Sequence, residues 1–384
     1  MRILYLTPFL PEPAASHGGG SYLSALADGM KEQANLGLVH IRHLGETLHP
    51  NPTFSWQRSA NYRGAPNGPS HQLRMLWRWR NQPLLAAKYW QPDLHQHLLH
   101  AIRDFQPDVA LVELAQMAQY LPSLSGIPTV FTDHEAGQPA NASTGMGRQA
   151  DRRDNRLWLR YIRKYYRQAN LIQALTQEDA AALSEIVDRE VLVRPPTLNI
   201  PPTACEPGKA PPRALFLGDY RHGPNPDAAK ILATEVWPLV RAACPNAELL
   251  LAGPNEHLIR ELDQLPGVKI LGFVPDLMEL LGRVRLVLAP LWSGRGFRVK
   301  NATALSFGVP VVTNELGSRG CRAPDPACII AENVQDLAKA ALRHLESAEF
   351  ASAAGELARD WACANYAPVA VARLQLDRAE QLLQ

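Results

Sequence analysis

Residues 286–313 read LVLAPLWSGRGFRVKNATALSFGVPVVT, and this stretch decides the fold. Its first apolar run has the length of a buried strand, and a turn containing Gly294 and Gly296 follows. A helix is expected over residues 300–307, and the apolar run from 309 to 313 predicts the next strand. A strand, a glycine-rich turn, a helix and a second strand in this order indicate a βαβ unit of a parallel sheet.

The same alternation extends through both halves of the chain, and it predicts an α/β fold. In the second half we expect a doubly wound sheet with strands at 214–217, 248–252, 269–271, 286–289, 309–313 and 328–330. Its helices are expected at 227–241, 256–264, 276–281, 300–307 and 334–345. The first half predicts strands at 3–7, 36–41, 109–113, 128–132, 171–175 and 191–193, and helices at 22–30, 94–105 and 157–169.

A proline-rich stretch at residues 194–212 separates the two halves, because prolines at this density cannot continue a helix or an inner strand. We therefore predict an N-terminal Rossmann-like domain over 1–200 and a C-terminal Rossmann-like domain over 201–346. Residues 347–384 are expected to form helices that pack back on the N-terminal domain.

Composition excludes several classes of protein. Of 384 residues, 46% are hydrophobic and 20% charged, which is typical of a globular chain, and the net charge of +2 argues against nucleic acid as a partner. The five cysteines contain no C-x-x-C pair, so we expect reduced thiols in a cytoplasmic protein, without a disulfide scaffold or a cysteine zinc site. His95, His97 and His100 do not complete a tetrahedral ligand set, and no metal site is predicted.

The start of the helix after the glycine turn carries unusual charge. Arg295, Arg298 and Lys300 lie where a helix dipole disfavours cations, and the free N–H groups of a helix start favour an anion. A negative ligand such as a diphosphate would complete such a site. A basic turn that simply faces water is the alternative interpretation.

The stretch also resembles the donor-site signature of GT-B glycosyltransferases, especially glycosyltransferase family 4. The resemblance rests on a framework of Ala304, Gly308, Pro310, Val311, Val312, Gly317 and Gly320. The segments FLGDYRHGPNPDA from Phe216, LLLAGP from Leu249 and LGFVPD from Leu271 resemble the neighbouring strands and loops of the donor domain. Near the start, residues 11–20 resemble the glycine loop of the other domain.

The resemblance implies two Rossmann-like domains that face each other across a cleft, with the acceptor on the first and a nucleotide sugar on the second. It implies transfer of a hexose to the hydroxyl of a glycan or lipid-linked acceptor, with retention of configuration and without a metal or another cofactor. Synthesis of a bacterial polysaccharide or lipid-linked glycan is the pathway expected by resemblance. For catalysis, it points to His134, Arg221, Arg298 and Lys300. For donor binding, it points to Gly218, Gly253, Phe273, Val274, Gly294, Gly296, Phe297 and Thr303, and for the acceptor or phosphate loop to Gly18, Gly19, Gly20 and Asp133.

Two departures from the family pattern leave alternatives open. Family members carry two glutamates eight positions apart in the donor motif, and the alignment puts Arg295 and Thr303 at those positions. A threonine cannot make the bidentate carboxylate contact with a ribose diol. A non-catalytic protein that binds a nucleotide or a partner therefore stays open, as does an epimerase acting on the nucleotide sugar.

Two basic segments are interleaved with aromatic residues, at 74–90 and at 152–167. Arginines next to tryptophans and tyrosines suit an anionic membrane surface, which would make the protein peripheral on the inner face of the membrane. They also suit a phosphorylated acceptor or a partner protein. The alternative is a set of core aromatics surrounded by arginines whose stems lie along the surface.

Overall fold

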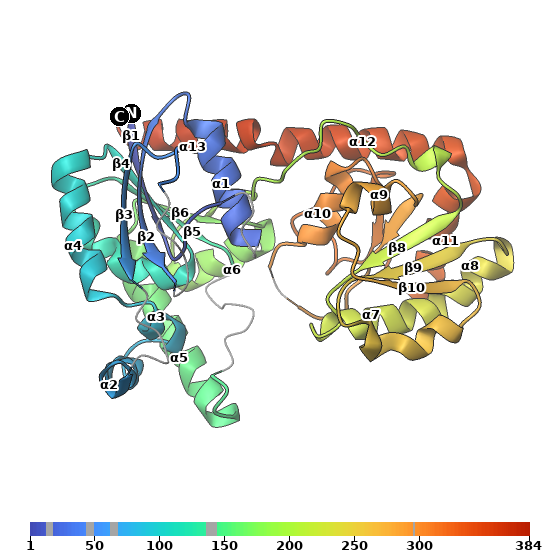
Figure 1. The fold of residues 1–384 in the computed structure, drawn as a ribbon, viewed down its shortest axis with the longest axis horizontal. Coiled ribbons are helices and arrows are strands. Elements are labelled where there is room, and N and C mark those ends of the chain that lie inside the picture. The colour runs from blue at the N-terminus through green and yellow to red at the C-terminus, as the bar shows by residue number, and fades with distance from the viewer. Residues whose placement is uncertain (13–17, 44–49, 62–67, 136–143, 295) are drawn as a thin grey trace. The chain divides into compact units, whose positions relative to one another are not determined.

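The computed structural model describes residues 1–12, 18–43, 50–61, 68–135, 144–294 and 296–384, and Figure 1 shows its elements. The chain divides into two compact units. Unit 1 contains Met1–Thr197 and Pro368–Gln384, and unit 2 contains Leu198–Ala367. The chain first passes from unit 1 to unit 2 between Thr197 and Leu198, inside the proline-rich stretch. No helix in the described part of the chain is both long and apolar enough to cross a membrane.

Unit 1 is built on a parallel sheet of seven strands in the order β3-β2-β1-β4-β5-β6-β7. The strands are β1 (Arg2–Thr7), β2 (Asn35–Arg42), β3 (Trp56–Asn61), β4 (Val109–Glu113), β5 (Thr129–Asp133), β6 (Leu171–Ala174) and β7 (Leu192–Val193). Alternate side chains of β1 enter different cores: Ile3 and Tyr5 pack on one face, and Leu4 and Leu6 on the other. Because both faces are buried, the strands read as continuous apolar runs.

Helices and shorter turns of helix connect these strands. They are α1 (Gly18–Met30), α2 (Gly68–Trp79), α3 (Leu84–Lys88), α4 (Pro92–His100), η1 (Ala101–Phe105), η2 (Ala115–Leu124), α5 (Arg148–Tyr165), η3 (Tyr166–Gln168) and α6 (Gln177–Val187), with α13 (Pro368–Gln381) from the chain's end. The sequence predictions had missed β3, α2, α3, η2 and α6. The strand β3 is an edge strand of mostly polar sequence, WQRSAN, so it lacks the apolar run that reveals the inner strands.

Unit 2 contains a parallel sheet of six strands in the order β10-β9-β8-β11-β12-β13. The strands are β8 (Arg213–Leu217), β9 (Glu248–Ala252), β10 (Val268–Gly272), β11 (Leu286–Leu288), β12 (Val311–Thr313) and β13 (Cys328–Ile330). The helical elements are η4 (Pro207–Lys209), α7 (Pro224–Ile231), η5 (Leu232–Val236), α8 (Trp237–Ala243), η6 (Glu256–Gln264), α9 (Leu277–Leu281), α10 (Val299–Ser306), α11 (Val334–Glu346) and α12 (Ala348–Tyr366). The expected α/β class and doubly wound sheets are confirmed.

The two C-terminal helices belong to different units, which differs from the expectation that both return to the N-terminal domain. The helix α12 packs on α10, α11 and η4 within unit 2. The helix α13 packs on α1 in unit 1, where a Cβ added to Gly29 would lie 2.7 Å from the carbonyl oxygen of Pro368. Glycine at position 29 therefore permits the two helix backbones to approach closely.

Candidate functional site

The candidate site in unit 2 is a pocket of about 500 Å³ at the carboxyl ends of the central strands. Its walls come from the residues after β8, β9, β10 and β11 and from the first turns of α10. The strand order reverses at β8, which lies between β9 and β11. Doubly wound folds bind ligands at such a reversal, because the loops on either side diverge and leave a crevice.

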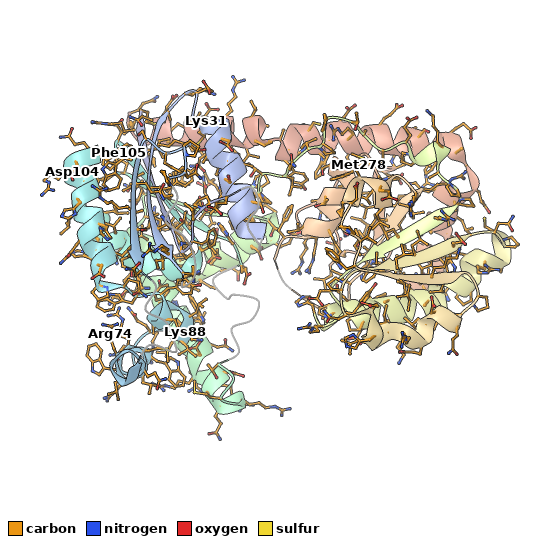
Figure 2. The ribbon with its side chains drawn as sticks, in the orientation of Figure 1. Lys31, Arg74, Lys88, Asp104, Phe105 and Met278 are labelled. Atoms are coloured by element: carbon orange, nitrogen blue, oxygen red, sulfur yellow. The ribbon has the colours of Figure 1, made fainter. Side chains whose placement is uncertain are left out.

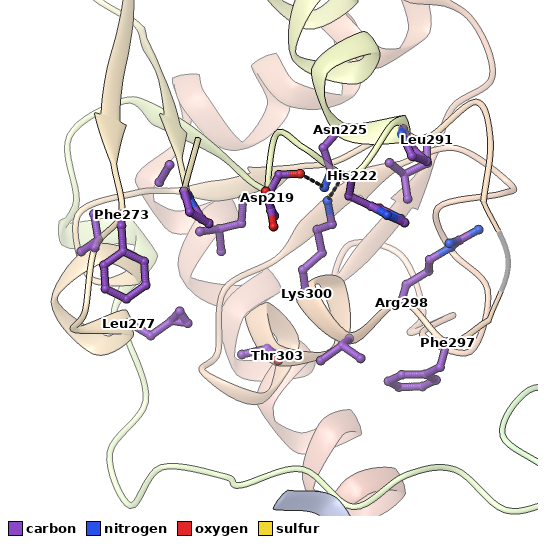
Figure 3. Close-up of a pocket in the computed structure, with 18 of the residues that line it drawn as sticks. Asp219, His222, Asn225, Phe273, Leu277, Leu291, Phe297, Arg298, Lys300 and Thr303 are labelled. Atoms are coloured by element: carbon purple, nitrogen blue, oxygen red, sulfur yellow. Dashed lines mark hydrogen bonds between the residues drawn. The ribbon is translucent and has the colours of Figure 1, made fainter. Parts of the chain in front are cut away.

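Figure 3 shows that the two ends of this pocket differ in chemistry. At one end Phe273, Val274 and Leu277 form an apolar wall. At the other end the wall contains His222, Arg298 and Lys300. The lining therefore suits a ligand with a flat apolar group at one end and negative charge at the other.

Lys300 is a half-buried cation of the pocket. Its Nζ donates a 2.7 Å hydrogen bond to Oδ1 of Asn225 and lies 4.5 Å from the ring centroid of Phe216. Burial, and secondly the positive charge of Arg298, lower the pKa of Lys300 to about 7. No carboxylate pairs with the Lys300 ammonium group in the described structure. An anion in the pocket would therefore stabilise the charged form of Lys300.

Arg298 is largely buried, and its guanidinium bonds to the backbone of the glycine turn and of the loop after β12. Nε donates to the carbonyl of Leu316 at 3.0 Å, and Nη2 donates to the carbonyl of Gly294 at 3.1 Å. Gly294 has a φ of 110°, which a residue with a side chain rarely adopts. Arg298 thus lines the pocket and also holds the glycine turn between β11 and α10.

Asp219 and Asn225 organise the loop after β8, and both were missed in the sequence analysis. Asn225 Nδ2 donates to the carbonyl of Asp219 at 2.8 Å, while Oδ1 of Asp219 accepts from the Arg221 N–H at 2.9 Å. This backbone bond, followed by the bond from Asn255, lowers the pKa of Asp219. Both residues lie in the segment FLGDYRHGPNPDA that was quoted for its resemblance to the donor domain. Asn225 follows Pro224 at the start of α7, and this position was the available signal.

Gly253 lets two strand ends approach each other at the base of the pocket. Its φ is 134°, and a Cβ there would lie 1.9 Å from the carbonyl oxygen of Gly218. Any side chain at position 253 would displace the loop that carries Asp219.

The pocket gathers most of the predicted donor and phosphate residues: Gly218, Gly253, Phe273, Val274, Phe297, Arg298, Lys300 and Thr303. Gly294 and Gly296 lie in the adjoining turn and do not line the pocket. Arg221 also lies outside the lining, is exposed, and donates from Nε to Oδ1 of Asn255 at 2.7 Å. Arg295 lies outside the described residues. Among the described residues that line the pocket, Asp219 is the only carboxylate.

A second polar cluster lies at the carboxyl edge of the unit 1 sheet. The Glu113 carboxylate, at the end of β4, accepts from Nε2 of His134 and from Nη2 of Arg194, each at 2.8 Å. The Tyr22 hydroxyl on α1 bonds Nδ1 of His134. Burial, and secondly the charge of Glu113, raise the pKa of Tyr22 well above its usual value. Both ring nitrogens of His134 therefore face protein partners.

Glu113, Arg194 and Tyr22 were not identified from the sequence. Glu113 reads as the last residue of an apolar strand, and Arg194 is fully buried although arginine is rarely so. Their association joins the ends of β4 and β7 to α1, which no local pattern reveals.

The remaining predicted residues of unit 1 have structural surroundings. Asp133 is fully buried, and its Oδ2 accepts from the Tyr166 hydroxyl at 2.5 Å. Gly18, Gly19 and Gly20 form the first turn of α1, whereas we expected them in a loop. The described residues contain no group of three His, Cys, Asp or Glu side chains that could hold a metal ion.

Comparison with known proteins agrees with this geometry. Residues 211–347 match the family model of "Glycosyl transferases group 1", and this segment contains the whole pocket lining. No curated protein matches the chain.

Solved structures match over the full chain at low sequence identity. Sucrose-phosphate synthase from Thermosynechococcus elongatus has a TM-score of 0.69 at 14% identity, covering 100% of this chain and 99% of that one. A glycosyltransferase from Rickettsia africae has a TM-score of 0.65 at 12% identity, covering 100% and 98%. HepE from Anabaena, in complex with UDP-glucose, has a TM-score of 0.59 at 16% identity, covering 99% and 100%. The α/β fold of this chain is therefore that of the GT-B glycosyltransferases, and its residues 211–347 match the group 1 family of these enzymes.

Proposed function

We propose that the chain is a glycosyltransferase that moves a hexose from a nucleotide-diphosphate sugar to an acceptor hydroxyl. The observation that carries this proposal is the pocket of unit 2, which joins an apolar wall to a cationic wall inside the segment that matches the family. In this proposal the base lies against Phe273 and Val274, and the diphosphate lies against Lys300 and the first turn of α10.

The cationic end would stabilise the leaving group. Negative charge accumulates on the departing diphosphate as the sugar bond breaks, and fixed donors lower that barrier without reorganising. Lys300 can supply an ammonium, and the N-terminal N–H groups of α10 point positive partial charge toward the same end. These groups can supply the charge that a divalent metal supplies in other transferases, so we propose a metal-independent reaction that needs no other cofactor.

The same proposal includes three further points. The reaction retains the configuration of the sugar, the acceptor is a glycan or is linked to a lipid, and the protein acts at the cytoplasmic side of a membrane. They rest on the resemblance of the donor motif. HepE and the E. coli trehalose-6-phosphate protein were crystallised with UDP-glucose and UDP-2-fluoro glucose, so uridine sugars are the first donors to test.

In unit 1 we propose that Glu113 and Arg194 are positioning residues for His134. A neutral His134 donates from Nε2 to Glu113 and accepts at Nδ1 from the Tyr22 hydroxyl. Contact between His134 and a sugar or acceptor therefore requires Tyr22 to turn away, or Tyr22 itself to present its hydroxyl. The role of His134 stays a prediction.

Calorimetry with UDP, GDP and ADP, and with the corresponding sugars, tests donor binding. Transfer of labelled sugar to a panel of glycan and lipid-linked acceptors tests catalysis. Binding without transfer or hydrolysis would favour a non-catalytic binding protein, which Thr303 in place of a carboxylate makes worth testing. Interconversion of the sugar without an acceptor would indicate an epimerase, and failure to bind any nucleotide would overturn the proposal.

A further inference from the structure

Helix α2 of unit 1 exposes a row of large apolar side chains. Leu73, Leu76 and Trp77 are 68%, 46% and 65% exposed, and their i, i+3, i+4 spacing places them on one face of the helix. Exposed apolar residues that occur singly need no explanation, but three neighbours on one face form a patch. We call Leu73, Leu76 and Trp77 the α2 patch.

A pocket of about 210 Å³ opens next to the patch, between the end of α2 and the middle of α5. Its described walls contain the cations Arg78, Arg160 and Lys164 together with aromatic rings, and they contain no carboxylate. Among the described residues that line the pocket no acidic group faces Arg160 or Lys164, and the buried Nε of Arg78 has no hydrogen-bond partner. We call Arg78, Arg160 and Lys164 the α5 pocket; its uncompensated charge suits a phosphate.

Positive charge continues along α5 beyond the pocket. The helix has seven basic residues against two acidic ones, and Arg152, Arg153 and Arg156 are exposed. Its aromatic residues Trp158, Tyr161 and Tyr165 are buried, so they leave these arginines exposed. Figure 1 shows α2 and one end of α5 away from the sheet of unit 1, and Figure 2 labels Arg74 and Lys88 in this region.

Contacts between α2 and α5 hold the apolar and the basic features together. Trp79 Nε1 donates to the Asp154 carboxylate at 2.8 Å, and the Arg153 guanidinium lies 4.8 Å from the Trp79 ring centroid. The α2 patch and the α5 pocket are therefore parts of one built surface.

We propose that this surface docks on an anionic lipid bilayer, with a lipid phosphate in the α5 pocket and the α2 patch among the upper acyl carbons. Apolar burial and attraction to anionic headgroups are the two contributions that hold a peripheral helix at a membrane, and this surface offers both. A second copy of the chain is a poor occupant, because it would bring two surfaces of the same positive charge together. Docking does not depend on the transferase proposal, so the two can fail separately.

Co-sedimentation with vesicles tests the proposal. We expect the protein to bind vesicles of phosphatidylglycerol and phosphatidylcholine, to bind pure phosphatidylcholine far less, and to dissociate as salt rises. Replacing the pocket cations in R160Q/K164Q should weaken binding by about twenty- to thirtyfold, from the attraction of roughly two basic residues. The matched control R152Q/R163Q removes the same charge from the same helix outside the pocket and should weaken binding less.

The α2 patch is tested in the same assay with L73S/W77S. We expect binding to fall at least tenfold, because two large apolar groups no longer enter the interface. The control L258S removes an exposed leucine from unit 2 and should bind as the unaltered protein does. Brominated acyl chains should quench tryptophan fluorescence, and W77F should lose most of that quenching while it keeps its binding.

Equal binding to neutral and anionic vesicles, or patch and pocket variants that bind normally, would overturn the proposal. Concentration-dependent dimers that vanish in L73S/W77S, without vesicle binding by the unaltered protein, would assign the surface to self-association instead. Circular dichroism of each variant checks the fold, which these exposed positions should leave intact. Vesicle binding in a protein that binds no nucleotide would leave docking standing and remove the transferase proposal.

Discussion

Replacing Lys300 with methionine should stabilise the protein and weaken its binding of a nucleotide diphosphate. Methionine keeps the apolar stem and deletes the charge. Burial lowers the pKa of Lys300 from 10.5 to about 7, and a lysine shifted this far destabilises the folded state by about 4 kcal/mol at pH 7. The loss of the hydrogen bond to Asn225 removes about 1–2 kcal/mol. The net gain should be about 2–3 kcal/mol.

The sign of the pH dependence follows from the same shift. Between pH 7 and 10.5 the folded protein holds fewer protons at Lys300 than the unfolded chain, so the free energy of unfolding should rise with pH there. The methionine variant should lack this contribution. The part of the stability difference that comes from the pKa shift is therefore largest below pH 7 and should vanish above 10.5, where only the lost hydrogen bond to Asn225 remains and the variant should be the less stable protein.

Two measurements check the prediction. Thermal unfolding should give a melting temperature roughly 5 °C higher for the variant at pH 7, from the effect of about 2 kcal/mol on a unit of this size. Calorimetry with UDP should show about thirtyfold weaker binding, the effect of one lost charge-assisted hydrogen bond. A less stable variant would refute the reasoning about burial, and unchanged UDP binding would refute the phosphate role of Lys300.

Three further predictions concern other parts of the chain. UDP binding at pH 8 should take up protons, seen as a binding enthalpy that varies with the buffer, because the phosphate raises the pKa of Lys300; the uptake should vanish in the methionine variant. Gly253→Ala should lower the free energy of unfolding by more than about 2 kcal/mol in a denaturant titration, since its Cβ would overlap a carbonyl oxygen. Glu113→Gln should cost about 3–5 kcal/mol by leaving the Arg194 charge buried and unpaired, and adding Arg194→Met should recover part of this loss.

The sequence predicts the layered fold well because buried parallel strands are continuous apolar runs. All six strands of unit 2 were predicted, including the short β11 and β12 on either side of the glycine turn. It fails at β3, whose polar residues pair along an edge, and at α2, whose exposed apolar face resembles neither a core helix nor a loop. The spacing of apolar residues reveals an element only where its apolar face is buried. Helices and strands whose apolar residues are few or exposed are therefore not predicted from that spacing.

The candidate sites divide in the same way. Residues next to the glycine turn, such as Lys300, could be predicted because one short segment carries both the turn and the charge. Glu113 and Arg194 could not, since their ion pair joins strand ends 81 residues apart. A motif locates a residue in the chain but does not give the direction of its side chain. Arg221 lies in the loop after β8, but its side chain bonds Asn255 outside the pocket.

The division of the chain has a consequence for synthesis on the ribosome. Unit 2 is one continuous segment, whereas unit 1 needs its last helix, α13, to cover α1 and complete one of its cores. Domains generally fold in the order in which they leave the ribosome. Residues 1–197 of unit 1 are expected to complete their fold only after residues 368–384 have been synthesised. We expect nascent chains that stop short of Pro368 to carry a finished unit 2 and an N-terminal half with an uncovered apolar face, so truncation of the C-terminal helix should destabilise unit 1.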